Sequence, residues 1–171
     1  QINAWMSEVS PGIKVSAIPY FDVNLMGLRY SISSSMGEES TNALNMGFGV
    51  SYVLPIIVAL LKAREGDLIV LENPEAHLHP KGQTELGKLI AATAHTGCQV
   101  VVETHSDHLF DGVRIYAKNN KGFAEKVLTH WFEQNKGISK VTSIVIDNYG
   151  RIRKWPQGMF DQFETNASEL L

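Results

Sequence analysis

The sequence predicts an α/β fold with parallel strands, and three observations point to it. Residues 67–72 and 98–103 form continuous apolar runs, which are typical of strands covered on both faces of a parallel sheet. A segment with helical character follows each run, and glycine or proline separates one segment from the next. This strand–helix–strand–helix order implies parallel strands joined by right-handed crossovers.

The N-terminal third of the chain is predicted to be mainly extended. Apolar and polar residues alternate at 13–19 and 23–32, which indicates two strands of a β-meander. The Ser-, Glu- and Asn-rich stretch 33–45 is predicted to be a loop. An apolar helix is then expected at 51–63, with Ser51 capping its start and a proline in its first turn, where a missing N–H costs little.

Glycine and proline set the boundaries of the α/β core. Gly66 ends the apolar helix before the first apolar strand, and an amphipathic helix begins after Pro80. Gly97 ends that helix before the second apolar strand, and a further helix is expected at 106–118. The two apolar strands, the amphipathic helix between them and the helix at 106–118 form the predicted parallel core.

The C-terminal part changes to a β-rich pattern. Its predicted elements are strands 127–133, 139–147 and 151–155 and a closing helix at 158–171. The turn at 148–150 is expected to join the last two strands. We therefore expect two domains, with the α/β core in 1–126 and a small β-rich subdomain in 127–171.

Composition limits the classes of protein that fit. The chain has 171 residues, 44% of them hydrophobic, and a net charge of −3, so it can bury a core but has no general basic field for nucleic acid. The single cysteine, Cys98, excludes an internal disulfide and fits a reducing cytoplasm. The longest apolar stretch, 53–61, is far short of the roughly 20 residues that cross a bilayer, so we expect no membrane partner. Because the sequence shows no leader and does not begin with methionine, we expect a piece of a longer polypeptide.

Three clusters of polar or glycine residues lie at the ends of predicted elements. They are Glu72–Pro80 after the first apolar strand, Glu103–His108 after the second, and the glycine loop Asn45–Ser51 before the apolar helix. Ligands of open parallel sheets bind beyond the carboxyl ends of the strands. A carboxylate at such a strand end can meet Mg²⁺ on a nucleotide, as in a Walker B motif. A glycine loop that opens a helix can supply N–H groups to a phosphate, and a histidine on the next strand can contact the γ-phosphate or the attacking water.

The motifs GFGVSY, ENPEAHLHP and ETHSD together resemble the second half of ABC-type P-loop ATPases. The resemblance is to the branch with the OLD and chromosome-maintenance (SMC) ATPases. The tail IVIDNYGRIRKWPQGMFDQF is similar to the uncharacterised C-terminal domain of one bacterial AAA-labelled ATPase group. The resemblance implies part of an ABC-type sheet with flanking helices, followed by a small β-rich extension.

The resemblance also implies roles for individual residues. The implied catalytic residues are Glu72, Glu75 and His105. The implied nucleotide-binding residues are Asn45, Gly47, Gly49, Ser51 and Asn73. Glu72 would also bind Mg²⁺ on the nucleotide, and Glu75–Pro80 would line a dimer interface. ATP would be sandwiched between two subunits, and family members often work on DNA or against phage with a nuclease partner.

The sequence departs from the family pattern at three points. The family commonly places Asp then Glu at the end of the Walker B strand, whereas this chain has Glu72 then Asn73, so the usual base is an amide. Glu75 could substitute, or hydrolysis is slow. Gly47 stands where the signature serine is usual, with Asn45 or Ser51 as compensating groups. The sequence contains no phosphate-binding loop, so the chain alone is expected to be inactive.

One segment imitates a phosphate-binding loop. Residues 82–89, GQTELGKL, nearly spell G-x-x-x-x-G-K-[ST], but the last residue is a leucine rather than a hydroxyl that can bind Mg²⁺. The segment also overlaps the amphipathic helix, rather than a loop after a strand. We therefore predict that it is part of that helix.

Two other functions fit parts of the sequence. A metal-dependent hydrolase could use the His-x-His pair at 77–79 with the cluster Glu103–His108. A slow-hydrolysing, nucleotide-switched interaction module would fit Asn73 and a β-rich tail that docks a partner. We interpret the basic residues of the tail as a solvated face: Lys136, Lys140, Arg151, Arg153 and Lys154.

Overall fold

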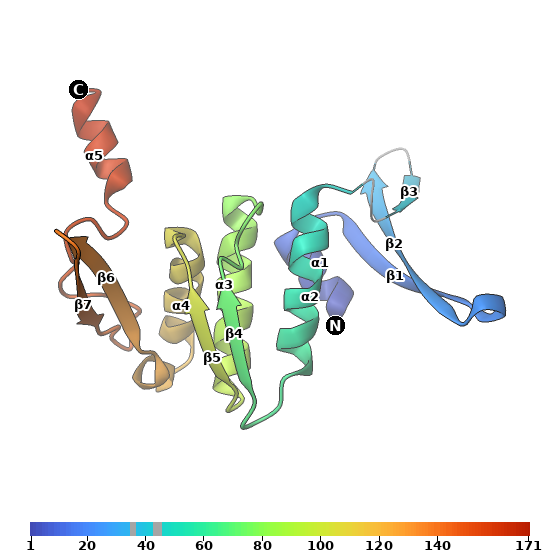
Figure 1. Cartoon of the computed structure of the whole chain (residues 1–171), viewed down its shortest axis with the longest axis horizontal. Coiled ribbons are helices and arrows are strands. Elements are labelled where there is room, and N and C mark those ends of the chain that lie inside the picture. The colour runs from blue at the N-terminus through green and yellow to red at the C-terminus, as the bar shows by residue number, and fades with distance from the viewer. Residues whose placement is uncertain (35–36, 43–45) are drawn as a thin grey trace. The chain divides into compact units, whose positions relative to one another are not determined.

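A computed structural model describes residues 1–34, 37–42 and 46–171 of the chain. The chain forms two compact units, Gln1–Gly112 and Val113–Leu171. Figure 1 shows the elements of each unit. The predicted domain boundary after residue 126 stays a prediction. Within the described residues, none of the helices has the length and apolar composition needed to cross a bilayer.

The first unit begins with a helix and an antiparallel sheet. Its elements are α1 (Ile2–Val9), β1 (Ile13–Tyr20), β2 (Leu25–Ser34) and β3 (Gly37–Asn42), with sheet order β1-β2-β3. The two strands of the meander are found as predicted, whereas α1 was not predicted. The prediction of a loop at 33–45 is wrong, because 37–42 pairs with β2 from Arg29 to Ser34. A polar segment can form a strand at a sheet edge, where its backbone bonds to one neighbouring strand only.

The helix α2 (Phe48–Lys62) begins earlier than the sequence predicts. Its N-cap is Gly47, whose φ of −55° and ψ of 140° are extended, and among the described residues no side-chain hydrogen bond caps the helix. Ser51 therefore lies inside the helix, and its predicted role as the cap is wrong. Pro55 likewise lies inside the helix rather than in its first turn. Glycine is accepted at an N-cap, so no hydroxyl is needed there.

The parallel core is found as predicted. β4 (Leu68–Glu72) pairs in parallel with β5 (Gln99–Glu103). α3 (Pro80–His95) lies between these strands in the chain, and α4 (Asp107–Asn119) follows them; Pro80 stands in the first turn of α3, where it needs no N–H partner. Gly66 and Gly97, which precede the two strands, have φ of +86° and +96°, values that favour glycine.

Helices cover only one face of this two-stranded sheet. Figure 1 shows α3 and α4 behind β4 and β5. Alternate residues of both strands are exposed, and on the open face Leu68, Val70 and Val101 are 61%, 68% and 48% exposed. The expectation that both faces are covered is therefore not met by the described residues, and the apolar runs leave a bare apolar face.

Three glycines let α3 pack directly against other backbone segments. A Cβ on Gly82 would lie 2.3 Å from the Val9 carbonyl oxygen, and one on Gly87 would lie 2.1 Å from that of Leu109. A Cβ on Gly112 of α4 would lie 2.2 Å from the Thr84 carbonyl oxygen. The glycines of the segment that imitates a phosphate-binding loop are thus buried packing residues inside a helix, as predicted.

The second unit begins inside α4 and is β-rich beyond it. After a 3-10 helix at Phe123–Lys126, its elements are β6 (Thr129–Asn135), β7 (Ile138–Ile144) and α5 (Gln162–Glu169). The predicted strand at 151–155 is wrong: the described residues there form only an isolated bridge between Ile146 and Ile152. The turn predicted at 148–150 is found, because the Asp147 side chain accepts the N–H groups of Tyr149 and Arg151, but in the described residues the pairing beyond it stops at this one bridge.

Candidate functional site

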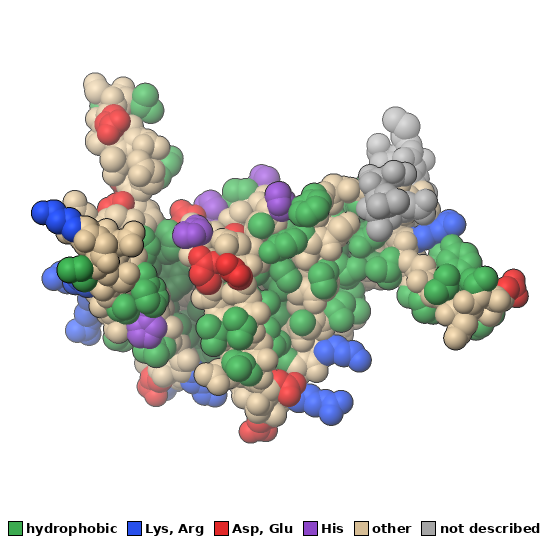
Figure 2. Space-filling model, viewed as in Figure 1, with side chains coloured by type: hydrophobic (Ala, Val, Ile, Leu, Met, Phe, Trp, Pro, Cys, Tyr) green, Lys and Arg blue, Asp and Glu red, His purple; other side chains and the backbone are tan. Residues whose placement is uncertain are grey.

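Two carboxylates stand side by side at the end of the parallel sheet. Glu72 and Glu103 are register partners at the last position of β4 and β5. Both belong to the exposed set of alternating residues, so their side chains lie on the open face of the sheet. Figure 2 shows acidic and histidine side chains gathered over these strand ends, above the apolar face. Sequence reasoning gave Glu103 no role in the nucleotide site, although both apolar runs end in Glu.

Asn73 turns the chain away from the sheet beside these carboxylates. Its φ is +45°, a left-handed conformation that asparagine tolerates better than most residues. Its backbone N–H donates to the Glu103 carbonyl oxygen at 3.0 Å and lies 3.3 Å from Glu103 Oε2. The Asn73 N–H therefore binds both the backbone and the side chain of Glu103 at the end of β5.

His105 also contacts Glu103. Its Nε2 lies 3.2 Å from Glu103 Oε1, and its side chain is 84% exposed. The carboxylate therefore orients an imidazole that stays open to a ligand. The predicted residues Glu72, Asn73 and His105 are brought to one rim by the strand pairing, with Glu103 between them.

Glu75 lies beneath this rim rather than on it. The residue is 7% exposed, and its Oε1 accepts hydrogen bonds from Thr104 Oγ1 at 2.7 Å and from the His105 N–H at 3.2 Å. Its Oε2 is buried and has no hydrogen-bond partner among the described residues. The contacts of Glu75 thus support the loop that carries His105, and its predicted catalytic role stays a prediction.

The loop after β5 is fixed by a chain of hydrogen bonds to the start of α4. Thr104 Oγ1 accepts the Ser106 N–H at 3.0 Å. The Ser106 hydroxyl donates to Gln83 Oε1 at 2.6 Å and accepts the Leu109 N–H at 2.9 Å, which caps α4. The histidine between Thr104 and Ser106 is therefore held by both neighbours.

The glycine loop lies against the segment that follows β4. A Cβ on Gly49 would lie 2.4 Å from the His77 carbonyl oxygen, so this contact requires glycine. Among the described residues, none lies within 4 Å of a Cβ built on Gly47, and its φ is negative, so the described contacts give no packing or turn reason for this glycine. The rings of Phe48 and His77 meet edge to face at 4.8 Å.

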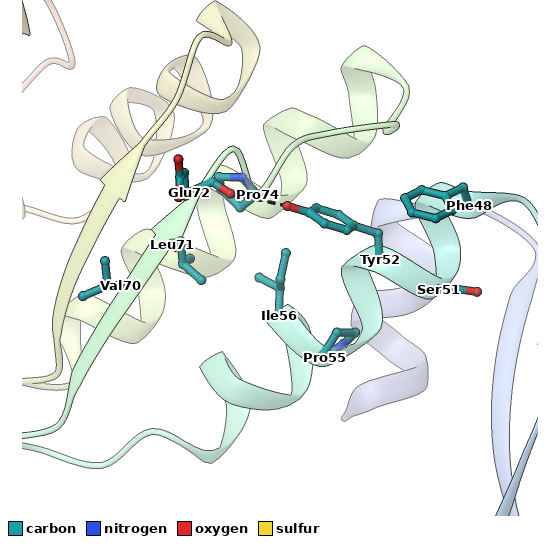
Figure 3. A pocket seen from close by; sticks show the side chains of 9 residues that line it. All are labelled: Phe48, Ser51, Tyr52, Pro55, Ile56, Val70, Leu71, Glu72 and Pro74. Atoms are coloured by element: carbon teal, nitrogen blue, oxygen red, sulfur yellow. Dashed lines mark hydrogen bonds between the residues drawn. The ribbon is translucent and has the colours of Figure 1, made fainter.

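Tyr52 joins α2 to the end of β4. Its hydroxyl donates to the carbonyl oxygens of Glu72 and Asn73 at 3.4 and 3.3 Å. Beside it, a groove of about 440 Å³ is lined by Phe48, Ser51, Tyr52, Pro55, Ile56, Val70, Leu71, Glu72 and Pro74. Figure 3 shows the Tyr52 hydroxyl directed at the strand end, whereas Ser51 points away from it. Sequence reasoning missed Tyr52, whose partners are far away in the sequence.

The other predicted residues have different outcomes. Gly47, Gly49, His77 and His79 line a second hollow of about 190 Å³. Asn45 lies outside the described residues.

Within 1–34, 37–42 and 46–171, no three His, Cys, Asp or Glu side chains are grouped so that they could hold a metal ion. The alternative of a metal-dependent hydrolase therefore has no support from the geometry. Burial raises the pKa of the Cys98 thiol, as does the charge of Asp67, in keeping with a buried structural residue.

Two protein families match the chain. Residues 31–111 match the family described as "AAA domain, putative AbiEii toxin, Type IV TA system". Residues 124–170 match a family described as a protein of unknown function (DUF3696). The second match fits the predicted resemblance of the tail to an uncharacterised C-terminal domain. No curated protein matches the chain.

Solved structures of SMC ATPases share the fold. One, from work on ATP-driven dimerization and DNA-stimulated activation of SMC ATPases, is 15% identical with a TM-score of 0.59, over 98% of this chain and 88% of that one. An SMC head bound to the C-winged helix domain of ScpA is 14% identical with a TM-score of 0.63, over 85% and 41%. An SMC head of Pyrococcus furiosus bound to the C-terminal domain of ScpA is 14% identical with a TM-score of 0.57, over 99% and 36%.

The chain spans less than half the length of the two SMC heads solved with ScpA. Its α/β core and small β-rich C-terminal part agree with the predicted fold class. The family match and the shared fold together confirm the predicted resemblance. The chain therefore shares the fold of SMC ATPase heads and resembles the ABC-type P-loop ATPases.

Proposed function

We propose that the chain supplies one side of a composite ATP site, which closes when two subunits associate. The observation that carries the proposal is the convergence of Glu72, Glu103 and His105 at one rim. The glycine loop lies beside that rim, against the segment after β4. ATP hydrolysis needs these groups near its phosphates, and they come from separate parts of the chain.

The donor set at the rim fits Mg²⁺ on a nucleotide. Glu72 and Glu103 offer exposed carboxylate oxygens at neighbouring strand ends, and Mg²⁺ prefers such oxygens with its remaining positions on water and phosphate. When bound, the ion neutralises charge on the phosphates. His105, which contacts Glu103, is proposed to donate a hydrogen bond to the terminal phosphate.

The residue at the usual position of the catalytic base, Asn73, supports slow ATP turnover. The Asn73 side chain is an amide and cannot take a proton from water. Glu75 is buried and engaged with Thr104 and His105, which leaves Glu103 as the exposed carboxylate nearest to His105. We propose that Glu103 orients the attacking water through or beside His105. A slow enzyme of this kind would use ATP mainly as a switch for association.

The phosphate cradle is proposed to come from a different stretch of polypeptide. The bare apolar face of β4 and β5 supports this idea, because a parallel sheet is stable when both faces are covered. The dimer contact is proposed to involve Gly47 and the segment Glu75–Pro80. ATP-driven dimerization and DNA-stimulated activation of an SMC relative support a DNA-linked or anti-phage process, in which a nuclease is a suitable partner.

The test uses the assembly that contains this chain and a phosphate-binding loop. We expect Glu72→Gln to lower Mg²⁺-dependent ATP turnover by about 100-fold, because a charged oxygen near the metal is lost while shape is kept. Phosphate release at saturating ATP measures this loss. Glu8→Gln, an exposed residue on α1, is the matched control and should leave turnover unchanged. Unchanged turnover of the Glu72 variant would reject the proposal.

A further inference from the structure

We propose that the second unit, Val113–Leu171, carries a surface that binds single-stranded nucleic acid, centred on residues 147–155. This inference goes beyond the ATP site and does not depend on it.

The two units differ in the sign of their charge. Val113–Leu171 has nine Lys and Arg against six Asp and Glu, a net charge of +3. Gln1–Gly112 has six against twelve, a net charge of −6. The overall charge of −3 therefore hides a basic unit, and a basic unit attracts polyanions. Figure 2 shows Lys and Arg side chains along the edge of this unit.

Residues 147–151 form a rigid turn. Asp147 Oδ1 accepts the N–H groups of Tyr149 and Arg151, each at 2.9 Å, and Oδ2 lies 3.1 Å from Arg151 Nε. The backbone hydrogen bond from Arg151 lowers the pKa of the Asp147 carboxyl, so the group stays charged and the turn stays closed at neutral pH. Gly150 has a φ of +72°, and a Cβ there would lie 2.5 Å from the Arg114 carbonyl oxygen.

The turn presents two aromatic rings, each paired with an arginine. The Arg151 guanidinium lies 4.7 Å from the centre of the Tyr149 ring, and that of Arg114 lies 5.1 Å from the Trp155 ring. Arg114 Nε also donates to the Gly150 carbonyl oxygen at 2.8 Å, so the rings are held to one framework. The Tyr149 and Trp155 side chains remain 66% and 41% exposed.

Two further cations stand next to Trp155. Arg153 and Lys154 are exposed, and in the part of the chain that the structure describes neither makes an ion pair or a hydrogen bond through its side chain. Unpaired cations beside a ring suit phosphates that follow a stacked base. The sequence alone suggested a solvated face here, because Arg114, which ties the turn together, lies far away in the chain.

Cations beside exposed aromatic rings indicate the class of ligand that this surface binds. Cations alone would serve any polyanion, but exposed rings beside them favour a ligand with both phosphates and open bases. Single-stranded nucleic acid has both, whereas a duplex hides its base faces and an acidic peptide has no ring faces in register with its charges. We therefore assign the surface to single strands, with duplex DNA and simple polyanions as outcomes of the test.

The first experiment measures binding of a labelled oligothymidine of about 20 nucleotides by fluorescence anisotropy, with no nucleotide triphosphate present. We expect Arg153→Ala with Lys154→Ala to weaken binding by about tenfold at about 50 mM salt and to reduce the slope of log affinity against log salt by about 1.4. The matched control is Lys62→Ala with Arg64→Ala, which removes the same charge from exposed positions of the first unit. Equal loss in both variants would overturn the proposal.

The second experiment tests stacking. We expect the oligonucleotide to quench tryptophan fluorescence in the parent chain and in Trp5→Phe, and the quenching to be lost in Trp155→Leu. Circular dichroism checks that this variant is folded. Absence of binding, equal affinity for heparin or for duplex DNA, or quenching that persists without Trp155 would each overturn the inference. Because ATP is left out, these outcomes are separate from failure of the proposed ATP site.

Discussion

Two glycines at the start of α2 have different structural roles: Gly47 is the N-cap of the helix, and Gly49 lies in its first turn. Gly49 is required by the fold, because its α-carbon faces the backbone of His77 with no room for a side chain. Gly47 has free space where a side chain would stand. A residue that leaves space unused at a helix N-terminus allows a ligand to approach the backbone N–H groups. The two residues should therefore respond differently to the same substitution.

We expect Gly49→Ala to lower the free energy of unfolding by about 1–3 kcal/mol, because the added methyl group overpacks a backbone contact. Gly47→Ala should leave thermal stability within about 0.5 kcal/mol. In the ATPase assembly, Gly47→Ala should weaken nucleotide-dependent dimerisation, which light scattering after size exclusion measures. Equal melting temperatures for the two variants would contradict this account of the loop.

At the scale of elements, the loops that follow β4 and β5 form one unit. Glu75 from the first loop accepts hydrogen bonds from Thr104 and His105 of the second. Asn73 donates to the backbone and side chain of Glu103 at the strand end. The position of His105 is therefore decided by the pairing of the strands and by a buried carboxylate, rather than by its own neighbours in sequence.

Two substitutions separate a positioning role of Glu75 from a catalytic one. Glu75→Gln keeps the accepting oxygen, so we expect ATP turnover of the assembly to remain within about threefold, since a single neutral hydrogen bond is worth about 1 kcal/mol. Glu75→Ala leaves buried donors unpaired and should lower stability by about 1–3 kcal/mol. The NMR chemical shifts of the His105 backbone amide should change in the Ala variant and stay close to those of the parent in the Gln variant. Loss of turnover in Gln equal to that in Ala would assign a proton-transfer role instead.

At the scale of the whole molecule, the chain exposes apolar surface where a soluble sheet is usually covered. Leu68, Val70 and Val101 lie together on the open face of β4 and β5. A two-stranded sheet with a bare apolar face attracts other apolar surfaces. We expect this face to contribute to how the isolated chain behaves in solution.

We expect the isolated chain to bind the dye ANS and to self-associate as concentration rises. Val70→Thr with Val101→Thr should lower both effects, because threonine keeps the strand shape and removes apolar area. Sedimentation velocity and dye fluorescence measure the change. Leu128→Thr, an exposed apolar position of the second unit, is the control. If the control lowers association as much as the double variant, this face is not the cause.

Local features of the sequence predict the core well. Gly66, Gly97 and Pro80 mark boundaries that depend on backbone conformation, and these are found where the sequence places them. Pairing between distant segments is harder to predict. The polar strand β3 is stable only because β2 lies beside it, and the contact of Glu103 with His105 depends on the local backbone and on strand register. The predicted roles of Glu72, Gly47 and His105 in ATP chemistry stay predictions, although the fold brings Glu72 and His105 to one rim.

The close approach of α3 and α4 has a consequence for anyone who redesigns this chain. Gly87 and Gly112 meet with no side chain between them, and Ser106 at the start of α4 is bound to Gln83 of α3. A methyl group at either glycine would clash with the backbone of the facing helix and push α4 away from α3. His105, which lies just before α4, would move with it. The position of His105 therefore also depends on two residues that have no side chain at all.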